Sequence, residues 1–300
     1  MVTRLDQELT RRVKRSARDE LGARLVGVAS VDRFAGAPRG HHPTDFLPQC
    51  RAVVVLGMPI VRGLMRWGEF MAHSEIVPET APVPGDGDKH QWQPLRALQM
   101  HVERRCAYEA INDDLQTMSL RLACFIEEHG HEAMYLPTTF GSTHSWNHAG
   151  PNPVRAFGPF SHRHAAVAAG LGNFGKSNLF LAPRYGPRVR LVSVLTGAPL
   201  VPDPMCDPHV CLDKCDQCVT HCPAGAFGQM VEFRVGGQAQ VMAKFDIEKC
   251  RDYYNRGVRR CNGECMTACP LVLRKLRCVE DADNARGAAP LASCRTSTSA

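Results

Sequence analysis

The run Cys211-Leu-Asp-Lys-Cys215-Asp-Gln-Cys218-Val-Thr-His-Cys222-Pro223 and the later run Cys261-Asn-Gly-Glu-Cys265-Met-Thr-Ala-Cys269-Pro270 carry the pattern that decides the fold of this 300-residue chain. The bacterial pattern C-x2-C-x2-C-x3-C-P ends in the same way, and in it three thiolates hold one 4Fe–4S cluster while the fourth reaches the neighbouring cluster. In each run one spacing is a residue longer than in this pattern. We predict two 4Fe–4S clusters. A pair of zinc sites is the alternative, because closely spaced cysteines also bind structural Zn²⁺.

The crossing of the fourth cysteine to the other cluster predicts which sulfurs share one cluster. The first predicted set is Cys211, Cys215, Cys218 and Cys269, and the second is Cys222, Cys250, Cys261 and Cys265. Cys206 is the alternative to Cys211 in the first set. Most of the remaining cysteines are expected to be inert core or surface thiols.

Cysteine usage narrows the class of protein. Eleven of the 14 cysteines lie from Cys206 onward, and without an export signal such a count indicates metal or redox chemistry instead of disulfides. Charged residues follow Arg11 where an export signal would have its apolar core, so we expect a cytoplasmic protein. The longest apolar run, residues 52–60, is far shorter than the roughly 20 residues of a membrane span.

The formal net charge of +6 is a weak indication of a nucleic-acid partner. An oxidised 4Fe–4S cluster with four thiolates carries about −2, so two clusters would leave a charge of about +2. Part of the basicity therefore offsets the predicted cofactors. We expect no membrane partner and no nucleic-acid partner other than a tRNA.

Apolar spacing along the first 200 residues predicts a mixed order of helices and strands. Helices are expected at 5–21, 94–129 and 162–169, and strands at 25–29, 52–57, 131–136, 178–181 and 188–195. This order indicates an α/β or α+β domain over residues 1–200, and residues 52–57 are apolar as in a sheet covered on both faces. Prolines between 199 and 208 mark the crossing to a cluster domain at 201–275. The composition of residues 276–300 predicts a flexible tail.

The stretch Gly170-Leu-Gly172-Asn-Phe-Gly175-Lys176-Ser177 satisfies both the dinucleotide pattern G-x-G-x-x-G and the phosphate-loop pattern G-x4-G-K-S. Both kinds of site need a strand before the glycines and a helix after them, because the helix N-terminus faces the phosphates. Here an alanine-rich helix comes first and a strand follows, so we expect no nucleotide site. The glycines are expected to let this backbone approach either another backbone or a flat ligand.

Residues 164–204, together with the cysteine runs, resemble the epoxyqueuosine reductase and reductive dehalogenase superfamily. The segments Tyr185-Gly-Pro-Arg-Val-Arg-Leu191 and Leu195-Thr-Gly-Ala-Pro-Leu200 are more similar to the dehalogenase branch. The resemblance covers residues 160–272 well and the elements before them loosely. It implies a nitroreductase-like α/β domain followed by a ferredoxin-like domain with two clusters.

The resemblance also implies a cobalamin in the front domain, to which the clusters deliver single electrons. Contact with cobalamin is expected at Gly170, Gly172, Gly175 and Lys176. Members of both branches reduce a carbon–oxygen or carbon–halogen bond. The expected electron donor is a low-potential protein of the ferredoxin or flavodoxin type.

The epoxyqueuosine reductases place an acidic proton donor shortly before the glycine turn, and the dehalogenases use a tyrosine. Residues 156–164 of this chain contain no carboxylate. The predicted proton donors are therefore His148, His162 and His164, because an imidazole donates a proton near pH 7. The alternative is that these histidines cap helices or bind loop carbonyls.

Four cations near the turn could bind an anionic substrate or the corrinoid phosphate, or could be ordinary surface or ion-paired charges: Arg163, Lys176, Arg184 and Arg188. The resulting hypothesis is a corrinoid-dependent iron–sulfur oxidoreductase that cleaves a bond in a small-molecule or nucleoside substrate. The alternative is an electron-transfer or corrinoid-reactivating protein that serves a partner enzyme.

Overall fold

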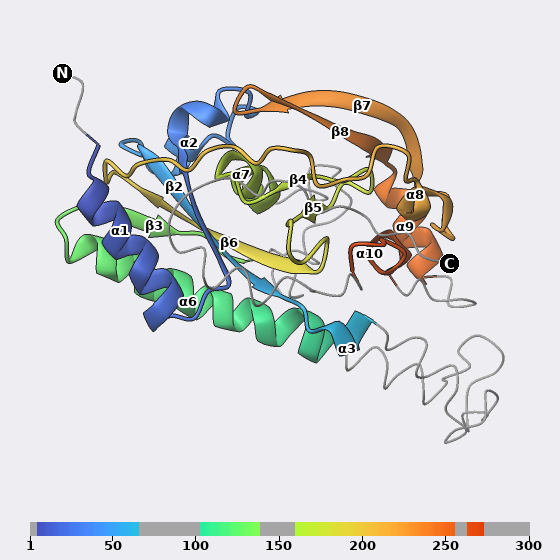
Figure 1. Ribbon diagram of the computed structural model, residues 1–300, viewed down its shortest axis with the longest axis horizontal. Coiled ribbons are helices and arrows are strands. Elements are labelled where there is room, and N and C mark those ends of the chain that lie inside the picture. The colour runs from blue at the N-terminus through green and yellow to red at the C-terminus, as the bar shows by residue number, and fades with distance from the viewer. Residues whose placement is uncertain (1–4, 66–102, 139–159, 256–262, 273–300) are drawn as a thin grey trace, which may run out of the picture.

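The computed structural model describes residues 5–65, 103–138, 160–255 and 263–272 (Figure 1). Its first helix, α1 (Gln7–Arg15), continues through a π-helical turn, η1 (Ser16–Glu20). Asp6 is the N-cap of α1, and its Oδ1 accepts a hydrogen bond of 2.8 Å from the backbone N–H of Leu9. This bond satisfies one of the amide groups that the first turn of a helix leaves without a partner.

Four antiparallel strands form the central sheet, in the order β1 (Leu25–Ser30), β2 (Ala52–Pro59), β6 (Val189–Thr196) and β3 (Ala133–Tyr135). In the register of the inner strands, Val54 of β2 lies opposite Val28 of β1 and Val194 of β6. These strands are rich in valine because a β-branched side chain packs well on a pleated, buried surface.

Helices cover both faces of the sheet (Figure 1). On one face, α7 (His162–Ala168) packs in the same core cluster as Val53 and Val55. On the other face, α1 and α6 (Ala110–Glu127) pack in a second cluster with Val54 and Leu56. All four β2 side chains are fully buried, which confirms the prediction that this sheet is covered on both sides.

Shorter elements connect and extend these layers. Before the glycine turn they are η2 (Val31–Phe34), α2 (Pro43–Phe46), α3 (Arg62–Met65) and the π-helical η3 (Glu103–Glu109). From the turn onward they are β4 (Asn173–Phe174), β5 (Phe180–Leu181), α8 (Gln217–Thr220), β7 (Phe227–Val235), β8 (Gln238–Phe245), α9 (Ile247–Asn255) and α10 (Glu264–Thr267). The three helices α8, α9 and α10 lie together beyond one end of the sheet (Figure 1).

The hairpin β7–β8 separates the two cysteine runs and was not predicted. It lies over α7, on the side away from the central sheet (Figure 1). Val235 of β7 belongs to the same core cluster as α7. The fully buried Gln240 of β8 accepts a 2.9 Å hydrogen bond from the backbone N–H of Phe174 in β4. The hairpin therefore joins the cysteine-rich part of the chain to the core of the front part.

The observed elements confirm the predicted mixture of helices and strands. The predicted strand 178–181 shortens to β5, and residues 94–102 of the predicted long helix lie outside the described residues, as does the tail 276–300. The division at residue 200 and the nitroreductase-like and ferredoxin-like domains stay predictions. Within the described ranges, no helix has the length and apolar character needed to cross a membrane.

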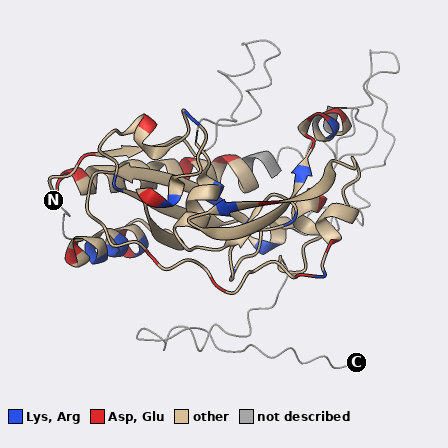
Figure 2. Cartoon of the chain, turned by 90° about the horizontal axis from the view of Figure 1, so that it is seen from above, with Lys and Arg blue, Asp and Glu red and all other residues tan. Residues whose placement is uncertain are grey.

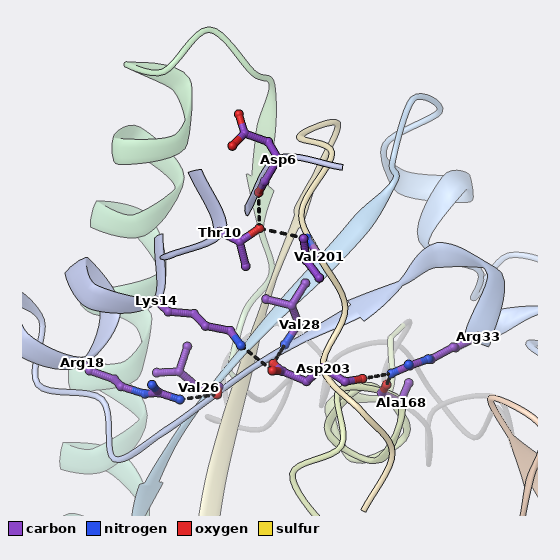
Figure 3. A network of polar contacts seen from close by, with 10 residues as sticks. All are labelled: Asp6, Thr10, Lys14, Arg18, Val26, Val28, Arg33, Ala168, Val201 and Asp203. Atoms are coloured by element: carbon purple, nitrogen blue, oxygen red, sulfur yellow. Dashed lines mark hydrogen bonds and ion pairs between the residues drawn. The ribbon is translucent and has the colours of Figure 1, made fainter. Parts of the chain in front are cut away.

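The proline-rich crossing between the two parts is fixed by Asp203 (Figure 3). One carboxylate oxygen pairs with the Lys14 ammonium of α1, and the other accepts a 2.9 Å hydrogen bond from the backbone N–H of Val28. The backbone N–H of Asp203 donates to Val28 O at 2.8 Å, so the crossing extends the free edge of β1. The Arg33 guanidinium donates to Asp203 O at 2.7 Å and to Ala168 O of α7 at 2.6 Å.

We expect Asp203→Ala to lower the free energy of unfolding by about 2 kcal/mol, because the change leaves the Val28 N–H and the Lys14 ammonium without their acceptor. Anaerobic urea unfolding followed by circular dichroism measures this effect. Asp19→Ala is the matched control, since Asp19 is an exposed carboxylate on η1, and it should change stability by less than about 0.5 kcal/mol. Equal midpoints for the two variants would contradict the role given to Asp203.

Candidate metal-cluster site

Four cysteines line one hollow in the structure: Cys211, Cys215, Cys218 and Cys269. They are the first predicted ligand set, and Cys269 comes from the second run. The rest of the lining includes the turn Gly175–Ser177 and the side chains of Leu181 and Leu271.

The two helices that carry the cysteines explain how the runs meet. Cys218 is on α8 and Cys265 is on α10, and these helices pack against each other. Cys269 follows α10 directly, where the N–H of Val272 donates to Cys269 O at 3.0 Å in a tight turn. This turn directs Cys269 toward the first run.

Three cysteines of the second predicted set also lie near one another. The pKa of Cys265 is raised to about 11, chiefly by burial and then by Cys250, Cys222 and Cys218. The pKa of Cys250 is raised by burial and then by Cys222. The fourth predicted ligand, Cys261, lies outside the described residues.

Burial also raises the pKa of the thiols around the hollow. The pKa of Cys269 rises to about 11, chiefly through burial and then through Cys218, Cys211 and Cys215. The pKa of Cys218 rises for the same main reason, and a hydrogen bond from Ser177 acts in the opposite direction. Deprotonating several such thiols together is unfavourable without positive charge between them, and bound metal supplies that charge.

Cys211 lines the hollow and Cys206 does not, so the geometry favours Cys211 as the first ligand. Cys206 instead lies before the run, where its carbonyl oxygen accepts hydrogen bonds from Gln238 (2.8 Å) and Asn173 (3.4 Å). Among the described residues, no three His, Cys, Asp or Glu side chains are gathered closely enough to bind a single metal ion. The cysteines surround a space and do not converge on a point.

The glycine turn follows α7 and precedes the short strands β4 and β5, in the predicted helix-to-strand order. A side chain at Gly170 would meet Pro204 O at 1.9 Å, and one at Gly172 would meet Leu181 O at 2.0 Å. At Gly175 it would meet the Leu181 side chain at 2.8 Å. The glycines thus admit neighbouring protein atoms, and backbone approach is the alternative that the geometry favours over a flat ligand.

Lys176 is also occupied by protein. Its ammonium donates to Asp213 O at 2.5 Å and to Cys215 O at 2.8 Å, both in the first cysteine run. The cobalamin contact expected at the three glycines and Lys176 stays a prediction. The turn lies against the loop that holds the cysteines.

Two of the three predicted proton donors have protein partners at their ring nitrogens. Nε2 of His162 donates to Pro137 O at 2.8 Å, so Nδ1 accepts from the Ser193 hydroxyl at 2.9 Å. Nδ1 of His164 lies 2.6 Å from Oγ of Ser161, the N-cap of α7. Burial lowers the pKa of both rings to about 4, so both are neutral at pH 7. These contacts fit the structural alternative, while His148 lies outside the described residues.

The other candidate cations differ in their surroundings. Arg163 donates to the backbone and side-chain oxygens of Asn178, which has a left-handed backbone with φ of 61°, so it stabilises the end of the turn. Arg184 is exposed beside the Tyr185 ring. Arg188 is buried, donates to Ile60 O at 2.7 Å, and its Nε has no partner among the described residues.

Sequence reasoning did not identify Ser177 as part of the site. Its side chain is 7% exposed, lines the hollow and hydrogen bonds to Cys218. The signal was present in the glycine motif, where Ser177 follows Lys176. Because the helix-to-strand order argues against a phosphate site, nothing in the sequence indicated another partner for this hydroxyl.

Comparisons with known proteins place the fold. No family model matches the chain. It is 32% identical over 115 residues to the tetrachloroethene reductive dehalogenase of Sulfurospirillum multivorans, and 32% identical over 117 residues to the epoxyqueuosine reductase of Listeria monocytogenes. These matches cover 35% and 38% of this chain, and 22% and 30% of the relatives.

Solved structures of both kinds of protein share the fold. An epoxyqueuosine reductase from Bacillus subtilis superposes on 89% of this chain with a TM-score of 0.54 and 17% identity, over 66% of that structure. A reductive dehalogenase superposes on 88% with a TM-score of 0.51 and 18% identity, over 32% of its own length. The chain thus shares its fold with epoxyqueuosine reductases and reductive dehalogenases, and part of it is similar to both in sequence. It spans less than two thirds of the length of these relatives.

The pKa of His162 gives a prediction on the stability of this protein. The unfolded imidazole has a pKa near 6.5 and the folded one about 4, so the unfolded state binds more protons between these values. Its contribution is complete above pH 6.5 and is lost as the pH falls to 4. Over this range we expect the wild type to lose about 3 kcal/mol more unfolding free energy than His162→Gln.

Anaerobic urea titrations at several pH values between 4 and 7 measure this difference. His131→Gln is the control, because His131 is partly exposed at the end of α6 and should keep the pH dependence of the wild type. A His162→Gln profile parallel to that of the wild type would show that the imidazole is not buried in its neutral form.

Proposed function

We propose that the chain is a cytoplasmic iron–sulfur reductase that cleaves a carbon–halogen or carbon–oxygen bond, with single electrons relayed through two 4Fe–4S clusters to a corrinoid. The observation that carries this proposal is the meeting of Cys211, Cys215, Cys218 and Cys269 around one hollow. The reductase names of both curated relatives support the class of reaction.

The donor set around the hollow fits an iron–sulfur cluster. Its metal-binding side chains are all cysteines, and soft thiolates select iron–sulfur clusters or zinc. A zinc ion holds four sulfurs at about 2.3 Å, which requires a compact group of ligands. A cubane occupies a volume and binds one thiolate at each of four corners. Thiols that line a hollow, with the fourth from the other run, match the second description.

One observation, at Arg188, supports the corrinoid. Arg188 is a buried cation just before β6, and its Nε, which has no partner among the described residues, suits an anionic group such as the corrinoid phosphate or an acidic substrate. It is close to the cluster site, because Gly186, two residues earlier, contacts Leu271 of the hollow's lining. An anion bound here would lie beside the first cluster.

The chemistry assigns simple tasks to the chain. Reductive cleavage of a carbon–halogen bond consumes two electrons and one proton and releases a halide ion. When bound, the clusters supply single electrons and a corrinoid supplies the bond-breaking chemistry. The cysteines hold the clusters, and the buried Leu181 and Leu271 limit water at the first one. The proposed proton donors remain His148, His162 and His164, of which His148 lies outside the described residues.

We propose a small-molecule or nucleoside substrate and an electron donor of the ferredoxin or flavodoxin type. One neighbouring structure is an epoxyqueuosine reductase with a tRNA stem loop, at 17% identity. In the view of Figure 2, acidic and basic residues are interspersed along the described ribbon. This mixture favours a small substrate over a tRNA, which binds through a contiguous basic face.

The first test is the composition of the anaerobically reconstituted protein. We expect about eight iron atoms and eight sulfides per chain, a broad absorption near 400 nm typical of such clusters, and binding of added cobalamin. Iron near four, or stoichiometric zinc, would remove the two-cluster proposal. Two intact clusters without cobalamin binding would favour the alternative, an electron-transfer protein that serves a partner enzyme.

The crossing of the fourth ligand gives a second test. Cys269→Ser should perturb the cluster of Cys211, Cys215 and Cys218, whereas Cys265→Ser should perturb the cluster of Cys222 and Cys250. Electron paramagnetic resonance of the dithionite-reduced variants should therefore show two different altered signals. Cys124→Ser is the control, because Cys124 is exposed on α6 and should leave both signals unchanged. The same altered signal in both variants would refute the pairing.

A further inference from the structure

We propose that Ser177 and Lys176 raise the reduction potential of the cluster held by Cys211, Cys215, Cys218 and Cys269. This inference rests on the clusters of the proposed function. It gives the glycine motif a role that neither a nucleotide site nor a corrinoid contact provides. The front domain would then tune the cluster that it touches.

Ser177 acts directly on a ligand sulfur. Its side chain and that of Cys218 line the same hollow, and hydrogen bonding to Ser177 lowers the pKa of the Cys218 thiol, against the larger effect of burial. The hydroxyl is buried, so water does not compete with it for the sulfur. Hydrogen bonds to cluster sulfurs are one of the main determinants of cluster potential, because they stabilise the added negative charge of the reduced state.

Lys176 acts on the loop that carries two further ligands. Its ammonium donates hydrogen bonds to Asp213 O and Cys215 O. Asp213 lies between Cys211 and Cys215 in the chain, so both acceptors belong to the loop that carries these two ligands. The Lys176 carbonyl accepts a 2.9 Å hydrogen bond from Ala243 N of β8, which fixes the backbone of the turn. The positive charge is thus kept at the wall of the hollow.

Charge decides the direction of the effect. A 4Fe–4S cluster with four thiolates changes from about −2 to about −3 on one-electron reduction. A fixed cation and an O–H donor both stabilise the more negative state, and a partly buried setting weakens solvent screening. Both side chains should therefore make the first cluster easier to reduce.

Potentiometric titration followed by electron paramagnetic resonance measures both midpoints in the loaded protein. We expect Ser177→Ala and Lys176→Met each to lower the midpoint of the first cluster, with the reduced-to-oxidised ratio at a fixed potential falling up to about tenfold, or 59 mV for one electron. The second cluster should not shift. The Cys269→Ser and Cys265→Ser spectra assign each signal to its cluster.

Three matched variants separate tuning from other effects. Ser177→Thr keeps the hydroxyl and Lys176→Arg keeps the charge, so both should retain the wild-type midpoint. Lys214→Met removes a charge from the same loop at an exposed position, and it should shift the midpoint less than Lys176→Met.

Unchanged midpoints in both Ser177→Ala and Lys176→Met, at full iron content, would overturn the inference and leave the clusters in place. Selective loss of the first cluster in these two variants, restored by Ser177→Thr and Lys176→Arg, would assign the side chains to cluster assembly and also overturn it. Wild-type protein without 4Fe–4S signals would instead remove the proposed function itself.

Discussion

The rest of the structure depends on bringing Cys269 to the hollow lined by Cys211, Cys215 and Cys218. The chain between the two runs must leave this point and return to it. The β7–β8 hairpin and α9 form this intervening segment, and α10 then packs against α8, which brings the second run back to the first. Because the hairpin shares a core with α7, it also attaches the cysteine-rich part of the chain to the front sheet. One geometric requirement thus organises both parts of the chain.

The attachment uses polar contacts as well as apolar ones. Asp203 ties the proline-rich crossing to the edge of β1 and to α1, and Arg33 links the same crossing to the end of α7. Lys176 connects the glycine turn to the first cysteine run. Short backbone distances at Gly170 and Gly172 leave no room for side chains, so the glycine motif is explained by close packing. A site for electron transfer benefits from such fixed surroundings, because a cluster potential depends on the dipoles around it.

Much of the fold could be predicted from one-dimensional patterns. The spacing of apolar residues identified α1, α6, α7, β1, β2 and β6, because each buries a periodic or continuous apolar surface. The hairpin β7–β8 was not predicted, because its strands carry the exposed Met230 and Val241 among polar residues. Its buried contacts are made to β4 and α7, which are far away in the sequence. Similarly, a sequence does not show that Pro137, Ser193 and Ser161 contact the ring nitrogens of His162 and His164, two of the predicted proton donors.

The sequence by itself determined the two cysteine runs, the crossed pairing expected of them and the helix-to-strand order of the glycine motif. These properties are local, because they depend only on residue type and spacing. Only the tertiary structure decided that Cys211 and not Cys206 lines the hollow, and that Lys176 and Ser177 face the cysteine loop. Such contacts join residues far apart in the chain, and their partners are selected by the packing of the whole fold, which no local spacing records.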